Sequence, residues 1–190
     1  MKIGIIDCGG ANLNSIYYSF KRMNIKTHIS NSLYELKKMD AFILPGVGTA
    51  GVVMNKLKEN NLINLIQETT KPTLGICIGM QILFDYSEED NTNCLGIIEG
   101  GVKKLKPNKD IKVPQMGWNK VITNVDNIGG YYYFANSYYT DNDDYAVGHS
   151  YYGKKINSIV KKDNFLGCQF HPEKSSDIGE KFIKNFINLV

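Results

Sequence analysis

One short stretch organises this chain: Gly75-Ile76-Cys77-Ile78-Gly79-Met80-Gln81. An apolar strand over residues 72–76 leads into it, and apolar residues at helical spacing over 78–86 follow it. A cysteine between strand and helix, with a glycine two residues away on either side, has the form of a nucleophile elbow in which cysteine replaces serine. The elbow places the thiol at a helix N-terminus, where the positive end of the helix dipole stabilises a thiolate. We therefore interpret Cys77 as a nucleophile rather than as a packed core cysteine.

The first half of the chain alternates between strand and helix patterns around this elbow. Short apolar runs predict strands, and apolar residues three and four apart predict helices between them. The predicted strands are 3–7, 27–30, 40–44 and 72–76, and the predicted helices are 12–23, 33–38 (capped by Ser32), 51–59, 62–68 and 78–86. Such alternation predicts an α/β fold with a mostly parallel central sheet flanked by helices on both faces.

The second half of the chain is dominated by strand patterns between Gly, Asn and Asp turns. The predicted strands are 102–105, 119–122, 131–135, 145–150, 159–161 and 165–170. An amphipathic helix is predicted over 176–189. We expect an antiparallel β extension on the parallel core. Because the sequence contains no repeat or linker, residues 1–190 are expected to form a single domain.

The composition excludes several classes of function. The chain has 190 residues, of which 43% are hydrophobic and 22% charged, as in ordinary globular proteins. A formal net charge of +3 is too small to predict a nucleic-acid partner. No apolar run approaches the roughly 20 residues that span a membrane, and no secretory signal is recognisable. Four cysteines without a Cys-x-x-Cys pair favour reduced thiols in a cytoplasm, and we expect no metal or other cofactor.

The segment Gln169-Phe170-His171-Pro172-Glu173 supplies a candidate base. His171 ends a predicted strand, at the edge where a parallel sheet opens its ligand crevice. Residues two apart in an extended chain project the same way, so Glu173 should lie roughly 6.6 Å along the strand from His171. Such a carboxylate fixes the imidazole tautomer and stabilises the imidazolium. A His-x-Glu pair alone indicates only a surface pair, but joined to the elbow it predicts a Cys77–His171–Glu173 triad.

The remaining histidines and cysteines lack such a setting. His28 lies in a polar strand and His149 in an expected turn, neither with a comparable partner. Cys8, Cys94 and Cys168 are interpreted as packing residues.

A third segment, Leu44-Pro45-Gly46-Val47-Gly48, follows a predicted strand and so lies on the same edge as the elbow. Its glycines allow the backbone to turn an N–H group towards the reaction centre. The N–H of Ile78, directly after the nucleophile, would point at the same place. Taken alone, the segment is also compatible with a plain strand-to-helix turn.

These three segments together resemble those of the class I (triad) glutamine amidotransferases, which have a flavodoxin-like fold. Further motifs are similar to the glutaminase subunits of imidazole glycerol phosphate synthase, and the resemblance runs across the whole chain. These motifs are Gly9-Gly10-Ala11-Asn12-Leu13-Asn14-Ser15, Gly46-Val47-Gly48-Thr49-Ala50, Met116-Gly117-Trp118-Asn119 and His171-Pro172-Glu173-Lys174-Ser175-Ser176. The resemblance implies that Cys77 attacks the side-chain amide of glutamine, that His171 protonates the departing ammonia, and that water hydrolyses the thioester to glutamate.

The resemblance also implies roles for individual positions. The oxyanion hole would be formed by backbone N–H groups of Val47 and Ile78. The glutamine-binding residues would be Gly46, Gly48, Gln81, Glu89, Ser137 and Tyr138, with Glu89 suited to the α-ammonium group by its charge. The residues facing a partner would be Asn12, Trp118, Tyr133 and Lys174.

A glutaminase of this length needs a partner. Free ammonia becomes unreactive ammonium in water, and 190 residues leave no room for a second catalytic domain. The resemblance implies a heterodimer with a HisF-type (β/α)8 cyclase subunit, which makes imidazole glycerol phosphate and aminoimidazole carboxamide ribotide in histidine biosynthesis. Gly117 and Asn119 favour a loop around Trp118, which places this tryptophan at the interface rather than in the core.

Two positions depart from the usual pattern of the family. Members commonly carry histidine where this chain has Gln115 and Asn136. Neither is the base of the triad, so glutamine hydrolysis should survive, and coupling to the partner is what the departures affect. A paralogous glutaminase that feeds another amination, such as amidation of a sugar, is therefore the alternative. A stand-alone γ-glutamyl hydrolase and a catalytically inactive binding module are further hypotheses, opposed by the partner-type motifs and by the intact triad respectively.

Overall fold

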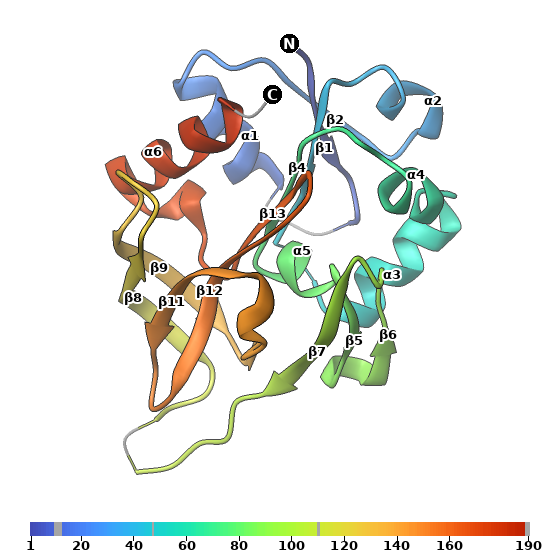
Figure 1. The fold of residues 1–190 in the computed structure, drawn as a ribbon. Coiled ribbons are helices and arrows are strands. Elements are labelled where there is room, and N and C mark those ends of the chain that lie inside the picture. The colour runs from blue at the N-terminus through green and yellow to red at the C-terminus, as the bar shows by residue number, and fades with distance from the viewer. Residues whose placement is uncertain (10–12, 47, 110, 189–190) are drawn as a thin grey trace.

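A computed structural model describes residues 1–9, 13–46, 48–109 and 111–188 of the chain. Within these residues the largest sheet has nine strands in the order β2-β1-β3-β4-β13-β12-β11-β8-β9 (Figure 1). Its parallel part consists of β1 (Ile3–Ile6), β2 (Thr27–Ser30), β3 (Ala41–Leu44), β4 (Thr73–Ile76) and β13 (Phe165–Cys168). Every residue of β1, β3, β4 and β13 is buried, as in a parallel sheet covered on both faces. The predicted α/β fold is confirmed.

Helices cover both faces of the parallel part, as Figure 1 shows. One face is covered by α1 (Leu13–Arg22) and α6 (Ser176–Ile187). The other is covered by α2 (Leu33–Leu36), α3 (Ala50–Glu59), α4 (Ile63–Gln67) and α5 (Ile78–Gln81). The predicted Ser32 cap is present, since its side chain accepts a hydrogen bond from the N–H of Glu35. No helix in the described part of the chain is long and apolar enough to cross a membrane.

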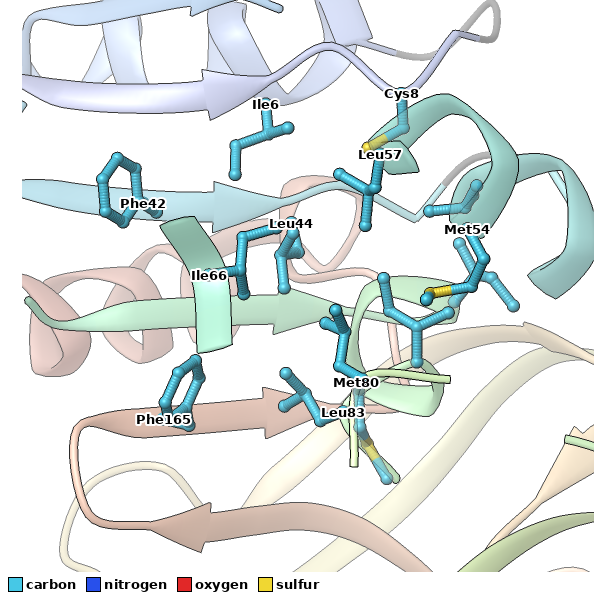
Figure 2. Close-up of a cluster of buried hydrophobic side chains, with 14 of the residues drawn as sticks. Ile6, Cys8, Phe42, Leu44, Met54, Leu57, Ile66, Met80, Leu83 and Phe165 are labelled. Atoms are coloured by element: carbon cyan, nitrogen blue, oxygen red, sulfur yellow. The ribbon is translucent and has the colours of Figure 1, made fainter. Parts of the chain in front are cut away.

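Two apolar clusters hold the helices against the sheet. In the first, side chains of the strands, such as Phe42 and Leu44, pack against Leu57 of α3 and Ile66 of α4 (Figure 2). In the second, the α1 and α6 side chains pack on the opposite face around Phe170. The amphipathic stripes predicted for these helices are therefore the faces that build the core.

The antiparallel extension is also present. It consists of β12 (Lys155–Lys162), β11 (Ala146–Tyr151), β8 (Gln115–Thr123) and β9 (Gly130–Asn136). Its last strand returns to the parallel part, because the N–H of His171 donates to the Tyr133 carbonyl at 2.9 Å. Beside that bond, the rings of Tyr132 and Phe170 stack with centroids 3.8 Å apart. The extension therefore closes over the end of β13, where the candidate base lies.

The predicted helix over 78–86 is wrong in its second half. In the structure α5 ends at Gln81, and the chain continues as β5 (Phe84–Ser87). This strand belongs to a smaller sheet, in the order β10-β7-β5-β6, with β7 (Ile98–Lys104), β6 (Thr92–Asn93) and β10 (Tyr138–Tyr139). Parallel pairing of β5 with β7 outweighs the helical spacing, because tertiary context overrides local propensity.

Several other boundaries also differ from the predictions. Strands β7, β8 and β12 are longer than expected, because their ladders continue through glycines and polar residues. Trp118 lies inside β8, so the loop expected around it is wrong. His149 lies inside β11, which confirms the strand predicted over 145–150 and contradicts the turn expected at His149. Short 3-10 turns occur at Glu89–Asn91, Asp143–Tyr145 and Pro172–Lys174.

Candidate active site

Cys77 lies on the predicted elbow, between β4 and α5. Its φ of 51° and ψ of −108° are unusual for a residue with a side chain, and such strain is concentrated at functional sites. The surrounding backbone holds the strain: the N–H of Cys77 donates to the Cys168 carbonyl at 2.7 Å, and its carbonyl accepts from Met80 at 3.0 Å. The thiol is thereby presented at the C-terminal edge of the parallel strands, where ligands bind in such sheets.

Gly75 and Gly79 of the elbow must be glycines because neighbouring backbone atoms occupy the space that a Cβ would need. A Cβ on Gly75 would lie 2.5 Å from the carbonyl oxygen of Gly79, and a Cβ on Gly79 would overlap the carbonyl of Leu44. A Cβ on Gly46 would lie 2.9 Å from the Cβ of Cys77 and 3.1 Å from Cε1 of His171. The glycine turn after β3 therefore runs directly beside the thiol and the imidazole.

His171 and Glu173 form the buried pair that was predicted, although by a different geometry. Nδ1 of His171 lies 2.8 Å from Oε1 of Glu173, and both side chains are almost fully buried. The expected extended backbone is absent: His171 caps a 3-10 turn over Pro172–Lys174, which brings Glu173 back towards it. Ser175 fixes the turn by donating its hydroxyl to the His171 carbonyl at 2.6 Å.

The surroundings of His171 favour the imidazolium. Burial lowers the pKa of His171, whereas the hydrogen bonds and negative charges of Cys77 and Glu173 raise it and outweigh burial, bringing it to about 10. An imidazolium between a carboxylate and a thiolate is the ion-pair arrangement that activates a cysteine nucleophile.

The other cysteines lack this environment. Burial, with a smaller contribution from the charge of Asp7, raises the pKa of Cys8 to about 12. Burial together with Glu89 raises that of Cys94 to about 11, and burial raises that of Cys168. Cys8 and Cys168 are fully buried, as expected for packing residues. Among the described residues, no group of three His, Cys, Asp or Glu is placed to hold a metal ion.

Three of the residues predicted to bind glutamine, Gln81, Ser137 and Tyr138, lie together where α5 meets β10. Nε2 of Gln81 donates to the Tyr138 carbonyl at 3.2 Å, which joins α5 to β10. Burial and then the charges of Glu89, Asp90 and Glu88 raise the pKa of Tyr138. Ser137 directly precedes Tyr138, and its carbonyl accepts from Leu105 at 2.9 Å.

Glu89 reaches the start of α3, next to the glycine turn. Its Oε2 accepts from the N–H of Ala50 at 2.9 Å, and the neighbouring Asp90 accepts from the Thr49 hydroxyl. Burial raises the pKa of the partly buried Glu89.

The predicted oxyanion hole is described only in part. Gly46 and Gly48 flank Val47, which lies outside the described residues. Ile78 begins α5 directly after the nucleophile.

Three of the four predicted interface residues form one surface cluster. Trp118 and Tyr133 are opposite one another on β8 and β9, with rings edge to face and centroids 6.4 Å apart. Lys174 Nζ lies 5.9 Å from the centre of the Tyr133 ring. Trp118 is 55% exposed, and the next residue on its face of β8, Met116, is 67% exposed. The fourth predicted residue, Asn12, lies outside the described residues.

Sequence reasoning missed two neighbours of the thiol. Gln169 Nε2 lies 3.6 Å from Cys77 Sγ, and the thiol can donate to the Ala135 carbonyl at 3.9 Å. A glutamine inside the predicted strand 165–170, two residues before the base, was a signal for the first, since amides in a buried strand need partners. No local pattern marks the second, because Ala135 contributes only backbone.

The two departures from the family pattern form one cross-strand pair. Gln115 of β8 is opposite Asn136 of β9, and both are buried. Asn136 Nδ2 donates to the Tyr138 carbonyl at 3.0 Å, which also accepts from Gln81. Both polar side-chain atoms of Gln115 and Oδ1 of Asn136 have no hydrogen-bond partner among the residues that the structure describes.

A strained cysteine elbow and a buried His–Glu pair on a mostly parallel sheet define a class I glutamine amidotransferase, and the comparisons agree. The family description "Glutamine amidotransferase class-I" matches residues 4–189. A crystal structure of a glutamine amidotransferase superposes with a TM-score of 0.79 at 17% identity, covering 98% of this chain and 97% of that one. PurLQS from Thermotoga maritima superposes with a TM-score of 0.72 at 18% identity, with the same coverage. At these sequence identities the two structures support the assignment of the fold alone.

Relatives of higher sequence identity identify the family more narrowly. The chain is 44% identical over 191 residues to imidazole glycerol phosphate synthase subunit HisH 2 of Campylobacter jejuni, covering 98% of both. It is 41% identical to HisH 2 of Legionella pneumophila over 194 residues, again covering 98% of both. It is also 41% identical to HisH of Haemophilus influenzae over 197 residues, covering 100% of this chain and 98% of that one. The chain therefore belongs to the class I glutamine amidotransferases, in the HisH family.

Proposed function

We propose that this chain hydrolyses glutamine at Cys77 and passes the ammonia to a HisF-type (β/α)8 cyclase, as the glutaminase subunit of an imidazole glycerol phosphate synthase. The observation that carries the chemistry is the buried His171–Glu173 pair beside a thiol on a strained elbow. The names of the full-length relatives support the pathway.

The chemistry follows from the geometry. The Cys77 thiol gives its proton to His171, and the thiolate attacks the side-chain amide carbon of glutamine. The tetrahedral intermediate collapses as His171 returns the proton to the leaving nitrogen, so that ammonia departs and a thioester remains. A water molecule, deprotonated by His171, then attacks the thioester and releases glutamate and the thiolate. Glu173 stabilises the imidazolium throughout, without taking up its proton.

Backbone and side chains around the thiol would orient the substrate. The N–H of Ile78, with that of Val47, would stabilise the oxyanion of each tetrahedral intermediate. The partly buried carboxylate of Glu89, at the start of α3, is suited to an α-ammonium group. Gln81, Ser137, Tyr138 and the glycines Gly46 and Gly48 would complete the glutamine site.

The exposed aromatic cluster supports transfer to a partner. Ala135, whose carbonyl faces the thiol, is opposite Met116 in the ladder, two residues from the Trp118–Tyr133 pair. The nucleophile is therefore next to the strands that carry this surface. Exposed aromatic residues and methionine on one face are typical of the centre of a protein interface. Lys174 adds a cation at its edge.

Reconstitution tests this function. The chain is mixed with a HisF-type cyclase, glutamine and the phosphoribulosyl substrate, and glutamate and imidazole glycerol phosphate are measured. We expect both products to appear together and Cys77→Ser to abolish both. No increase in glutamate when the cyclase is added would refute the function.

The Gln115–Asn136 pair favours a second candidate, a glutaminase that serves another amination such as sugar amidation. These residues stand where members of the family commonly carry histidine. Asn136 donates to the Tyr138 carbonyl of the proposed glutamine site, and Gln115 is opposite Asn136 in the ladder. Growth of a histidine auxotroph lacking its own HisH separates the candidates. Rescue by this chain supports the histidine pathway, whereas a soluble, folded chain that fails to rescue growth supports the alternative.

A further inference from the structure

A continuous series of buried amides leads from β10 to the thiol. Gln81 donates through Nε2 to the Tyr138 carbonyl at 3.2 Å and to Oε1 of Gln169 at 2.9 Å. Nε2 of Gln169 in turn lies 3.6 Å from Cys77 Sγ. Both glutamine side chains are almost completely buried, so water does not compete for these bonds.

The direction of this series is determined by its first member. A backbone carbonyl can only accept a hydrogen bond, so the atom of Gln81 that faces Tyr138 must be the NH₂ group. The same NH₂ group faces Gln169, which must therefore present its carbonyl oxygen there. The NH₂ group of Gln169 is consequently left facing the sulfur, and it can only donate to it.

The two protonation states of the sulfur have different partners. The neutral thiol can donate to the Ala135 carbonyl, 3.9 Å away, whereas a thiolate gains nothing from that acceptor. The thiolate accepts from Gln169 and from the His171 imidazolium. Hydrogen bonds to a charged group are stronger than those to its neutral form, so the Gln169 amide favours the thiolate.

We propose that Gln169 is a further catalytic residue, whose amide N–H stabilises the Cys77 thiolate, and that Gln81 is the positioning residue that sets its orientation. The role applies before attack and again when the thiolate leaves the thioester. It rests on the proposed function in that Cys77 is the nucleophile. In this proposal Gln81 orients the Gln169 amide in addition to contacting the substrate glutamine.

The test is the pH dependence of Cys77 alkylation, which needs no glutamine. The full chain is treated with iodoacetamide across a pH series, and modification of Cys77 is quantified by peptide mass spectrometry. We expect Gln169→Met, which keeps the length of the side chain but removes the donor, to raise the half-maximal pH by about one unit. Gln169→Glu, which adds a negative charge at the same place, should raise it further.

A matched control comes from α4. Gln67, an exposed residue, also donates its amide to a carbonyl, that of Leu95 at 2.7 Å. Gln67→Met removes an amide-to-carbonyl bond of α4 and should leave the alkylation profile unchanged. A profile that moves as far in Gln67→Met as in Gln169→Met would overturn the proposal.

A double-mutant cycle tests the orientation. Gln81→Met should shift the profile in the same direction as Gln169→Met, and the double variant should shift it no further than Gln169→Met alone. Additive shifts would refute the positioning role of Gln81. Unchanged profiles in both Gln169→Met and Gln169→Glu, each confirmed as folded by circular dichroism, would refute the role of Gln169.

Failure of the proposed function and failure of the Gln169 proposal give different results. If Cys77→Ala still hydrolyses glutamine in the reconstituted complex, the proposed function fails whatever the alkylation profile shows. If the profile shifts as expected in a chain that never turns over glutamine, the inference stands and the substrate is wrong.

Discussion

Replacing Gly75 by alanine tests whether the elbow holds the catalytic backbone in place. The new Cβ would lie 2.5 Å from the Gly79 carbonyl oxygen and 2.7 Å from the backbone nitrogen of Met80, and no rotamer change can move either of these backbone atoms. Reaching 3.0–3.4 Å requires α5 to move away from β4 by about 0.5–0.9 Å. The N–H of Ile78 moves with it.

The size of the effect follows from that displacement. A misplacement of about 1 Å costs roughly 100-fold in rate, and loss of an oxyanion donor costs roughly 100- to 1,000-fold. We expect kcat for glutamine hydrolysis in the complex to fall about 10- to 100-fold. KM should rise as well, because Gln81 of α5 belongs to the proposed glutamine site and moves with the helix. Overpacking should also lower the free energy of unfolding by about 1–3 kcal/mol.

The assay is steady-state glutamate release with the cyclase, together with urea unfolding of the isolated chain. Gly129→Ala is the matched control, because the nearest atom to its new Cβ is 3.7 Å away in Thr123 and is part of a side chain. It should match the unsubstituted chain in both measurements. A Gly75→Ala variant with unchanged kcat would refute the reasoning that this glycine positions the oxyanion donor.

Three further predictions concern the buried pair, the family departures and the surface cluster. The pKa of His171 is raised from 6.5 to about 10, so its contribution to stability is complete below 6.5 and is lost as the pH rises through 10. Glu173→Gln should weaken this loss in urea unfolding at a series of pH values, and an unchanged pH dependence would contradict the assigned cause. Gln115→Met removes two unpartnered buried atoms and should raise the free energy of unfolding by about 1 kcal/mol, whereas a decrease would show that its amide is satisfied. Trp118→Ala should weaken binding of the cyclase by about 2 kcal/mol, or roughly 30-fold in Kd by calorimetry, and an unchanged Kd would remove Trp118 from the interface.

The parts of this molecule that sequence reasoning predicts are those set by local physics. Buried parallel strands are continuous apolar runs, and α1, α3 and α6 carry the periodicity of helices that cover a sheet. The elbow is equally local, since strand, cysteine, helix and both glycines lie within a few residues. His171 and Glu173 are also neighbours in the chain, so their pairing was predicted even though the expected extended backbone was wrong.

What local patterns missed depends on contacts between distant segments. β5 exists because its backbone pairs with β7, and Trp118 is in a strand because β8 pairs with β9. The partners in the amide series of Gln81, Gln169 and Cys77 are 88 and 92 positions apart in sequence. Gln115 and Asn136 become one buried pair only through the register of two strands.

The sequence by itself determined that a thiol, its base and a carboxylate would meet at one edge of a parallel sheet, because each belongs to a short motif at the end of a buried strand. Only the tertiary structure decided what surrounds that thiol. The buried amide of Gln169, directly after β13, and the Ala135 carbonyl of β9 reach the sulfur, while the Tyr138 carbonyl of β10 accepts from Gln81. Hydrogen-bond partners are selected by distance in space rather than along the chain.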